Sequence, residues 1–498
     1  MTQELSRMSQ GSPFDRRRAG LLLHPTSLPG GYDNGDLGPE AYRFLDFMAA
    51  CGFTVWQTLP LGPPHDDRSP YSAQSVHAGN PRLIALEPLI EAGWLRADEG
   101  PRTGEDGWTY RQRRLIEARE GFEQQGGMEG EAYETFRGQH HYWLNDYALY
   151  QALRAAHGQA AWFDWPREVR DRQRETLAVM RRHYREAISQ CEFEQFLFYG
   201  QWTALKRYAN EHGILIFGDI PLFVGYDSAD VWARRDCFLL DDEGRREVVA
   251  GVPPDYFSAT GQLWGNPHYA WESMRADGFQ WWKERIRTQL TQFDLLRIDH
   301  FRGLEAYWEI PASAETAVSG QWRPAPGDEL FRALRAEFGR LPLVAEDLGI
   351  ITPEVEVLRD GHGLPGMKVL HFAFGGGADN PYLPHNHVLK SVVYSGTHDN
   401  NTTRGWFEEL DEGTRAHLFD YLGGGPEQIP ELLTRAAFAS VARLAVVPMQ
   451  DVLELGSESR MNRPGVADGN WCWRFRWEQV GPRVAEHYRH LLQLYGRV

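Results

Sequence analysis

Eight short apolar runs recur along the chain, and stretches with helical patterning separate several of them. Each run is continuously apolar rather than alternating, which is typical of parallel strands that are buried on both faces. The runs cover residues 19–24, 54–60, 213–221, 295–301, 342–349, 367–374, 391–397 and 444–451. The sequence therefore predicts eight core strands in a parallel sheet.

The stretches between the runs carry helix signals. One stretch starts with Pro39 and stops at Gly52, and these residue types mark the first turn and the end of helices. Trp282, Ile286 and Leu290 are spaced four apart and form an apolar stripe just before the fourth run. Alternating strands and helices indicate βαβ units, so the predicted fold class is α/β, a (β/α)8 TIM barrel.

The chain is much longer than such a barrel requires. It has 498 residues, whereas a plain barrel needs about 250. The surplus falls at about 61–212, between the second and third runs, and at about 225–275, between the third and fourth. We expect one catalytic domain over 1–498 with these two segments as inserted subdomains that shape the binding cleft. Residues 452–498, after the last run, are too few for a separate C-terminal β-sandwich.

Charge and cysteine usage exclude several classes of protein. The net charge is −17 without a dominant basic patch, which argues against nucleic acid and anionic membranes as partners. No stretch approaches the roughly 18 apolar residues of a membrane span, and the apolar run after the first arginines is too short for a signal peptide. The cysteines are widely spaced and form no C-x-x-C pair, which speaks against a zinc or redox site and fits a cytoplasmic protein; they are Cys51, Cys191, Cys237 and Cys472. The oligomeric state stays undetermined.

Acidic residues lie at the ends of four of the strand runs. They are Asp219, Asp299, Glu346 and Asp399, and the carboxyl ends of barrel strands form the active-site rim. Retaining glycosidases and transglycosylases need two carboxyl groups about 5–5.5 Å apart. Asp299 and Glu346 end neighbouring runs, and neighbouring strands lie about 4.8 Å apart. We therefore expect these two to act as a pair, with Asp399 facing them across the rim.

The motifs around these acids carry a resemblance. R-x-D-H after the fourth run, E-D after the fifth and H-D after the seventh resemble the signature of the α-amylase clan. The specific variants resemble the 4-α-glucanotransferases known as amylomaltase or disproportionating enzyme, and they occur in order along almost the whole chain. They are HPTSLPGGYDNGDLG (24–38), SPYSAQSVHAGNP (69–81), AGVPPDYFSATGQLWGNP (250–267), RIDHFRG (297–303), VAEDLG (344–349), GTHDNNT (396–402) and ESRMNRPG (458–465).

The resemblance implies a reaction and its catalytic residues. It implies transfer of α-1,4-glucan segments between malto-oligosaccharides, amylose or starch- and glycogen-derived glucans, without a cofactor. Asp299 is implied as the nucleophile that forms a covalent glycosyl ester. Glu346 is implied as general acid and then general base, and Asp399 as the carboxylate that holds the donor sugar.

The resemblance also implies a set of substrate-binding residues. Arg297 lies two residues before the nucleophile, on the same strand face, and would keep Asp299 ionised and oriented. The loop at 250–267 would cover the cleft with aromatic faces, which disfavours water and favours a sugar acceptor. The implied binding residues are Tyr71, Asp219, Tyr256, Phe257, Trp264, Arg297, His300 and His398.

Other interpretations of these residues stay open at this point. An α-amylase-type hydrolase uses the same carboxylates with water as acceptor, and a degenerate barrel can bind glucan without catalysis. Asp219 can also cap a turn, and Arg297 can be a structural ion-pair partner. For Asn462 and Asn470 a role at the site and a structural role are equally open. Departures from the family pattern at Val76, His77 and Asn401 leave some donor-side contacts unassigned.

Overall fold

All eight apolar runs form strands of one barrel. The computed structural model describes residues 13–254, 258–466 and 468–498. The strands pair in parallel in the order β10-β11-β12-β1-β2-β3-β6-β9, and the amide of Ala345 donates to the carbonyl of Pro365 at 2.8 Å, where β9 meets β10. The predicted (β/α)8 barrel is confirmed. Its strands are β1 (Arg18–Leu22), β2 (Val55–Gln57), β3 (Leu215–Ile220), β6 (Leu295–Ile298), β9 (Leu343–Ala345), β10 (Gly366–Val369), β11 (Ser391–Tyr394) and β12 (Leu444–Pro448).

The strands read as continuous apolar runs because both of their faces are buried. Leu22 and Val446 belong to the inner core of the barrel, whereas their neighbours Leu21 and Val447 belong to the larger core shared with the helices. Successive strand residues point to opposite faces. Apolar residues therefore occupy both faces of these strands along most of their length, without the polar–apolar alternation of a half-exposed strand.

Helices pack around the barrel where the patterns place them. A helix begins at Pro39 and ends at Cys51, one residue before Gly52. Gly52 has a φ of 87°, a conformation that glycine adopts without steric cost. The principal barrel helices are α2 (Pro39–Cys51), α11 (Gln280–Gln292), α12 (Gly327–Phe338), α13 (Pro353–Gly361), α16 (Glu431–Ala439) and α18 (Val484–Leu494).

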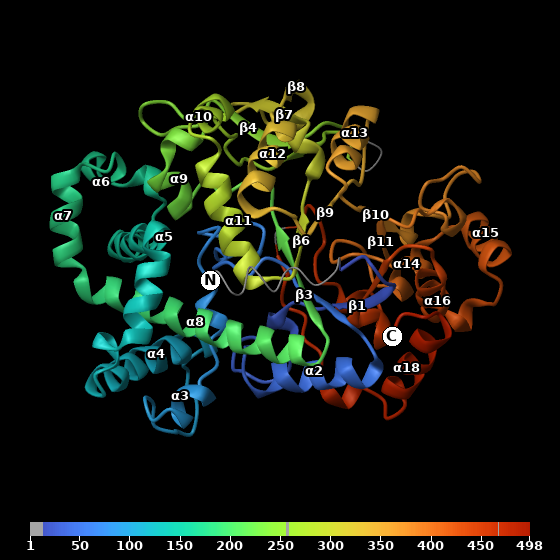
Figure 1. Cartoon of the computed structure of the whole chain (residues 1–498), viewed down its shortest axis with the longest axis horizontal. Helices are drawn as coiled ribbons and strands as arrows, with labels where there is room; N and C mark the ends of the chain where they lie inside the picture. Colours follow the sequence, from blue (N-terminus) through green and yellow to red (C-terminus); the bar gives the residue numbers. More distant parts are fainter. Residues whose placement is uncertain (1–12, 255–257, 467) are drawn as a thin grey trace.

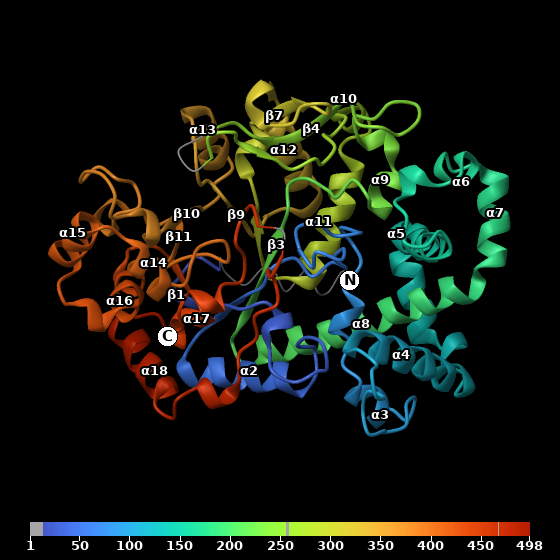
Figure 2. The same ribbon diagram turned by 180° about the vertical axis from the view of Figure 1, so that it is seen from behind.

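The long segment between β2 and β3 holds six α-helices joined by loops. Figures 1 and 2 show α4 to α7 gathered at one side of the molecule, with α14 to α16 at the opposite side. The inserted helices are α3 (Glu87–Glu91), α4 (Gly107–Gln124), α5 (Glu131–Ala156), α6 (Arg167–Arg170), α7 (Arg174–His183) and α8 (Arg185–Glu211). On the other side stand α14 (Thr403–Glu409) and α15 (Glu412–Leu422).

A second, antiparallel sheet joins two separate insertions. Its order is β5-β4-β7-β8, and its first two strands precede β6 while its last two follow it. It lies beside α10 (Trp271–Ala276) at the edge of the molecule that Figure 1 shows uppermost. The strands are β4 (Val248–Val252), β5 (Gln262–Leu263), β7 (Ala306–Pro311) and β8 (Gln321–Pro324). The pattern of apolar runs does not predict this sheet.

In the described residues after β12, no further sheet forms. After β12 the described residues form α17 (Met449–Val452), two short 3-10 helices and α18, so the predicted absence of a C-terminal β-sandwich is confirmed for this part of the chain. Within the described ranges, no helix has the length and apolar character needed to cross a membrane.

Candidate active site

Three adjacent strands deliver charged residues to one rim of the barrel. Asp219 lies near the end of β3 and is paired in register with Arg297 of β6. Asp299 directly follows β6, and its amide donates to the carbonyl of Ile220 at 2.9 Å. Glu346 directly follows β9, and its amide donates to a β6 carbonyl at 3.0 Å. The strand ladder thus continues through the acids and fixes their positions at the carboxyl end of the barrel.

A buried guanidinium links two of these carboxylates. Arg297 Nη1 lies 2.7 Å from Asp219 Oδ2, and its Nη2 lies 2.7 Å from Asp299 Oδ1. Residues two apart in a strand share a face, which explains how one side chain turns back to the other. Burial raises the pKa of Asp219, and the charge of Arg297 opposes this rise.

Tyr71 completes this network from the segment after β2. Its Oη donates to Asp219 Oδ2 at 2.7 Å. Burial and the neighbouring Asp219 carboxylate raise the pKa of Tyr71 well above its usual value. The phenol therefore keeps its proton and stays a donor, and Asp219 is held from two sides.

Glu346 is suited to exchange protons near neutral pH. Its Oε2 accepts a hydrogen bond from the His300 amide at 2.7 Å, and its Oε1 accepts one from the Leu348 amide at 3.0 Å. Burial raises the pKa of Glu346 to about 7, with Arg297 lowering it and Asp299 raising it. A carboxyl group with this pKa serves as either acid or base in neutral solution.

Asp399 has the opposite electrostatic character. It lies in the loop after β11, its side chain is 47% exposed, and His398 Nε2 lies 3.3 Å from its Oδ2. Asn462 donates to its Oδ1 at 2.6 Å. The surrounding cleft walls act to raise the pKa of Asp399, but the charge of His398 and the hydrogen bonds from His398 and Asn462 hold it below its usual range. This carboxylate stays ionised at neutral pH.

Aromatic rings connect the two sides of the rim. Tyr71 stacks on His398 with centroids 5.1 Å apart and planes 14° apart. Trp471 lies 6.0 Å from both rings and has a φ of 60°, which is unusual for a bulky residue. The trio forms a largely apolar wall beside the acids.

A second aromatic pair lies on the Glu346 side. Trp264, of which 38% is exposed, meets His300 edge to face with centroids 4.8 Å apart. Burial lowers the pKa of His300 to about 4, so this imidazole is neutral at pH 7. Tyr256 and Phe257, which the sequence analysis assigns to the same loop, lie outside the described residues.

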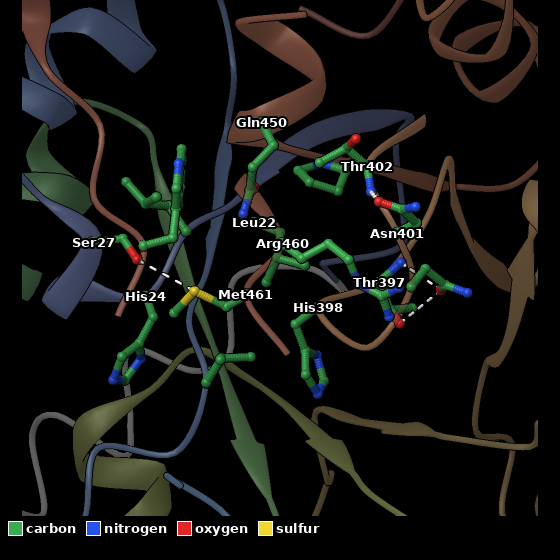
Figure 3. A pocket seen from close by; sticks show the side chains of 15 residues that line it. Leu22, His24, Ser27, Thr397, His398, Asn401, Thr402, Gln450, Arg460 and Met461 are labelled. Atoms are coloured by element: carbon green, nitrogen blue, oxygen red, sulfur yellow. Dashed lines mark hydrogen bonds between the residues drawn. The ribbon is translucent and has the colours of Figure 1, made fainter. Parts of the chain in front are cut away.

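The C-terminal segment forms a wall that the sequence analysis largely misses. Figure 3 shows a pocket in which Arg460 and Met461 of this segment meet His398 from the β11 loop and His24 from the end of β1. Arg460 also donates to the Asp399 carbonyl at 3.0 Å. The only sequence signal for these residues is the ESRMNRPG motif.

The two asparagines left open by the sequence differ in their contacts. Asn462 touches Asp399, as described above. Asn470 instead accepts a hydrogen bond from the Arg463 amide at 2.9 Å and donates to the Val466 carbonyl at 2.8 Å. Asn470 therefore stabilises the turn that presents the segment.

Two residues that depart from the family pattern, His77 and Asn401, form their hydrogen bonds with side chains other than the catalytic acids. His77 is 4% exposed, its Nδ1 lies 2.8 Å from Thr288 Oγ1, and its ring stacks on Trp143 of the helical insertion. Asn401 donates to Glu409 Oε1 at 2.8 Å and to Ser457 Oγ at 2.9 Å. His77 therefore supports a wall of the site from behind, whereas Asn401 also lines the pocket of Figure 3.

Known proteins share this architecture along almost their whole length. A family model described as 4-alpha-glucanotransferase matches residues 23–479. The 4-alpha-glucanotransferase of Thermus thermophilus is 48% identical over 97% of this chain and 99% of its own. The chloroplastic/amyloplastic 4-alpha-glucanotransferase of Arabidopsis thaliana is 43% identical over 98% of this chain and 87% of its own. The structure of an amylomaltase from Streptococcus agalactiae in complex with acarbose superposes with a TM-score of 0.92 and 36% identity, covering 97% of this chain and all of the other.

Proposed function

Because the chain belongs to the 4-alpha-glucanotransferase family, we propose that it transfers α-1,4-glucan segments by double displacement through a covalent glycosyl-enzyme. The chain is thus an enzyme of the transglycosylase type. The observation that carries the mechanism is the carboxyl pair on neighbouring strands. Asp299 is held by Arg297 at 2.7 Å, and Glu346 beside it has a pKa of about 7.

In the first step Asp299 attacks the anomeric carbon of the donor glucan. A glycosyl ester forms while the bond to the leaving 4-oxygen breaks, and the Glu346 proton passes to that oxygen. Arg297 keeps the attacking carboxylate ionised and oriented. Asp399, which stays ionised, holds donor hydroxyls and stabilises the positive charge that develops on the sugar ring.

In the second step Glu346, now ionised, removes the proton from the 4-hydroxyl of an acceptor glucan. The acceptor oxygen attacks the anomeric carbon, the ester to Asp299 breaks, and both carboxyl groups return to their initial state. The linkage broken and the linkage made are both α-1,4. The reaction therefore requires no external energy source and no cofactor.

The positions of the described side chains support the proposed binding roles. Tyr71 and His398 form a stacked pair that offers a platform for the donor sugar at the cleavage site. For Asp219, which is buried against Tyr71 and Arg297, a role in binding sugar hydroxyls is proposed on the family resemblance alone. Trp264 and neutral His300 line the acceptor side. Tyr256 and Phe257 are proposed for that side on the family resemblance alone.

The insertions supply the outer walls of this cleft. We propose that 61–212 and 225–275 are subdomains of one catalytic domain, since the first supplies Tyr71 and the second supplies Trp264 to the site. We also propose that the glucan substrates are soluble malto-oligosaccharides and starch- or glycogen-type chains of carbohydrate metabolism. A cytoplasmic location is proposed because the four cysteines, all within the described ranges, are free.

Incubation with maltotriose tests the reaction. Transfer produces glucose and longer glucans in equal amounts without new reducing ends, whereas a hydrolase produces a steady rise in reducing ends. The variants Asp299→Ala and Glu346→Ala should each lose roughly 100-fold or more of the transfer rate while their circular dichroism stays unchanged. Full turnover in either variant contradicts the assignment of the chemistry.

A further inference from the structure

Two backbone segments hold the carboxylate of Glu346, and one arginine joins them. The hydrogen-bond donors are the amide of His300, after β6, and the amide of Leu348, after β9. The amide of Phe301 also donates to the Glu346 carbonyl, at 3.1 Å. Arg302 extends from the first segment, and its Nη1 donates to the carbonyl of Ile350 in the second segment at 2.6 Å.

Arg302 is buried although none of the described carboxylates forms an ion pair with it. It is 7% exposed, and its Nε has no hydrogen-bond partner among the residues that the structure describes. Its guanidinium instead lies against the ring of Trp322, 3.8 Å from the centroid. A cation in contact with an aromatic face is stabilised by the ring quadrupole, most strongly where water is excluded.

Trp322 comes from the antiparallel sheet that lies outside the barrel. It sits on the edge strand β8, opposite Trp308 in the register of β7, and the two rings meet edge to face at 5.1 Å. Because 37% of Trp322 is exposed while Arg302 beneath it is buried, the tryptophan acts as a cover over the guanidinium.

We propose that Arg302, held under Trp322, is a positioning residue that clamps the two segments around Glu346. The inference rests on the proposed acid–base role of Glu346. Arg302 touches neither substrate nor reacting atoms, and it acts by keeping the His300 and Leu348 amides at hydrogen-bond distance from the Glu346 carboxyl. The outer sheet thereby supports the catalytic geometry as well as the cleft wall.

The clamp makes a specific prediction for the pH profile. The two amide hydrogen bonds lower the pKa of Glu346, so loosening them raises it. Glu346 must be protonated in the first step, and the basic limb of kcat/KM should then move to higher pH. The charged and titratable groups that face Glu346 are Arg297 of β6, Asp299 and His300 directly after β6, and Tyr382 from the segment after β10. The variants below keep all of them.

The test compares Arg302→Met, Trp322→Ala and Trp322→Phe with the wild type in maltotriose disproportionation between pH 5 and 9. Misplacement of a catalytic group by about 1 Å costs on the order of 100-fold in rate. We expect Arg302→Met to lose roughly 10- to 100-fold in kcat, with a smaller change in KM and a basic limb shifted upward. Trp322→Ala should show the same signature to a smaller extent, and Trp322→Phe should resemble the wild type.

Matched controls separate positioning from general damage. Arg323→Ala removes the next residue of β8, which pairs with Glu309 at 2.9 Å. Arg172→Met removes a guanidinium 4.3 Å from the centroid of the Trp232 ring, remote from Glu346 in the helical insertion. Both should keep the rate and the pH profile of the wild type.

The outcomes distinguish this clamp from the proposed function. A wild-type rate in Arg302→Met overturns the clamp, and so does a lower rate with an unmoved basic limb. If Arg302→Met does not fold, Trp322→Ala decides by the same two criteria. Glu346→Gln serves as the reference: if it retains activity, the acid–base assignment has failed, whereas an inactive Glu346→Gln beside a normal Arg302→Met refutes the clamp alone.

Discussion

Removing Arg297 tests how the two carboxylates of the rim are held. The guanidinium is 5% exposed and Asp219 is fully buried, so Arg297→Met leaves a buried carboxylate without its counter-ion. Breaking a buried pair by removing one partner costs about 3–5 kcal/mol. At about 2.1 cal/mol/K per residue, the unfolding entropy of a chain of this length is roughly 1 kcal/mol/K, so the melting temperature should fall by about 3–5 °C.

The loss should depend on pH in a defined direction. Without Arg297 the folded-state pKa of Asp219 lies further above its unfolded value, since burial already raises it. A raised carboxyl pKa stabilises the fold at low pH, and this contribution disappears as the pH rises through the folded-state value. Arg297→Met should therefore melt closer to the wild type at pH 5 than at pH 8.

The double variant Arg297→Met/Asp219→Asn separates stability from catalysis. Removing the stranded charge should restore most of the melting temperature, because replacing both partners of a buried pair is far less costly than removing one. Activity should stay low, since Asp299 still lacks its guanidinium. As a contrast, Arg82 pairs with Asp33 at the same 2.7 Å but is 28% exposed, and Arg82→Met should shift the melting temperature by about 1 °C or less.

Differential scanning calorimetry at a fixed scan rate and the maltotriose assay provide both readouts. The reasoning is refuted if Arg297→Met melts like the wild type at pH 8. It is equally refuted if the double variant regains full activity, because Asp299 would then need no cationic partner.

Three further predictions follow from single features. In the wild type, kcat/KM should decline as the pH rises past about 7, because Glu346 with a pKa of about 7 must be protonated to act as acid; a profile that is flat to pH 9 contradicts this. Trp264→Ala should release more new reducing ends per transfer event in the maltotriose assay, since it opens the acceptor side to water. Arg497 is fully buried and donates to the carbonyls of Phe438 at 2.7 Å and Ser440 at 2.8 Å, so Arg497→Met should lower the melting temperature by about 3 °C or more at unchanged 25 °C activity.

The barrel could be predicted from the sequence because its signal is local and repeated. Each core strand is buried on both faces, so a continuous apolar run identifies it without knowledge of its partners. The outer sheet offers no such signal. Both residues of β5 and all four residues of β8 are exposed, and β4 and β7 come from either side of β6, so only tertiary contact shows that they pair.

The catalytic acids could also be predicted from the sequence, because the strand signal is local. The wall opposite them could not be predicted in this way. Asp299 and Glu346 lie at the ends of recognisable runs. Asn462 reaches Asp399 across 63 residues of sequence, and Trp471 takes a backbone conformation that no propensity favours. Contacts over such a separation depend on how the C-terminal segment returns across the barrel. The spacing of residues along the sequence does not determine that path.

Glu346 and Asp399 show how one rim produces two kinds of carboxyl group. Glu346 is half-buried, and among the described residues its carboxylate accepts hydrogen bonds from backbone amides alone, so desolvation dominates and its pKa rises to about 7. Asp399 is half exposed and receives His398 and Asn462, so donors and charge dominate and its pKa falls. The roles of proton carrier and permanent anion therefore depend on which segment surrounds each group. Exchanging the two residue types alone should not exchange their functions, because the barrel strands and the C-terminal segment impose the difference.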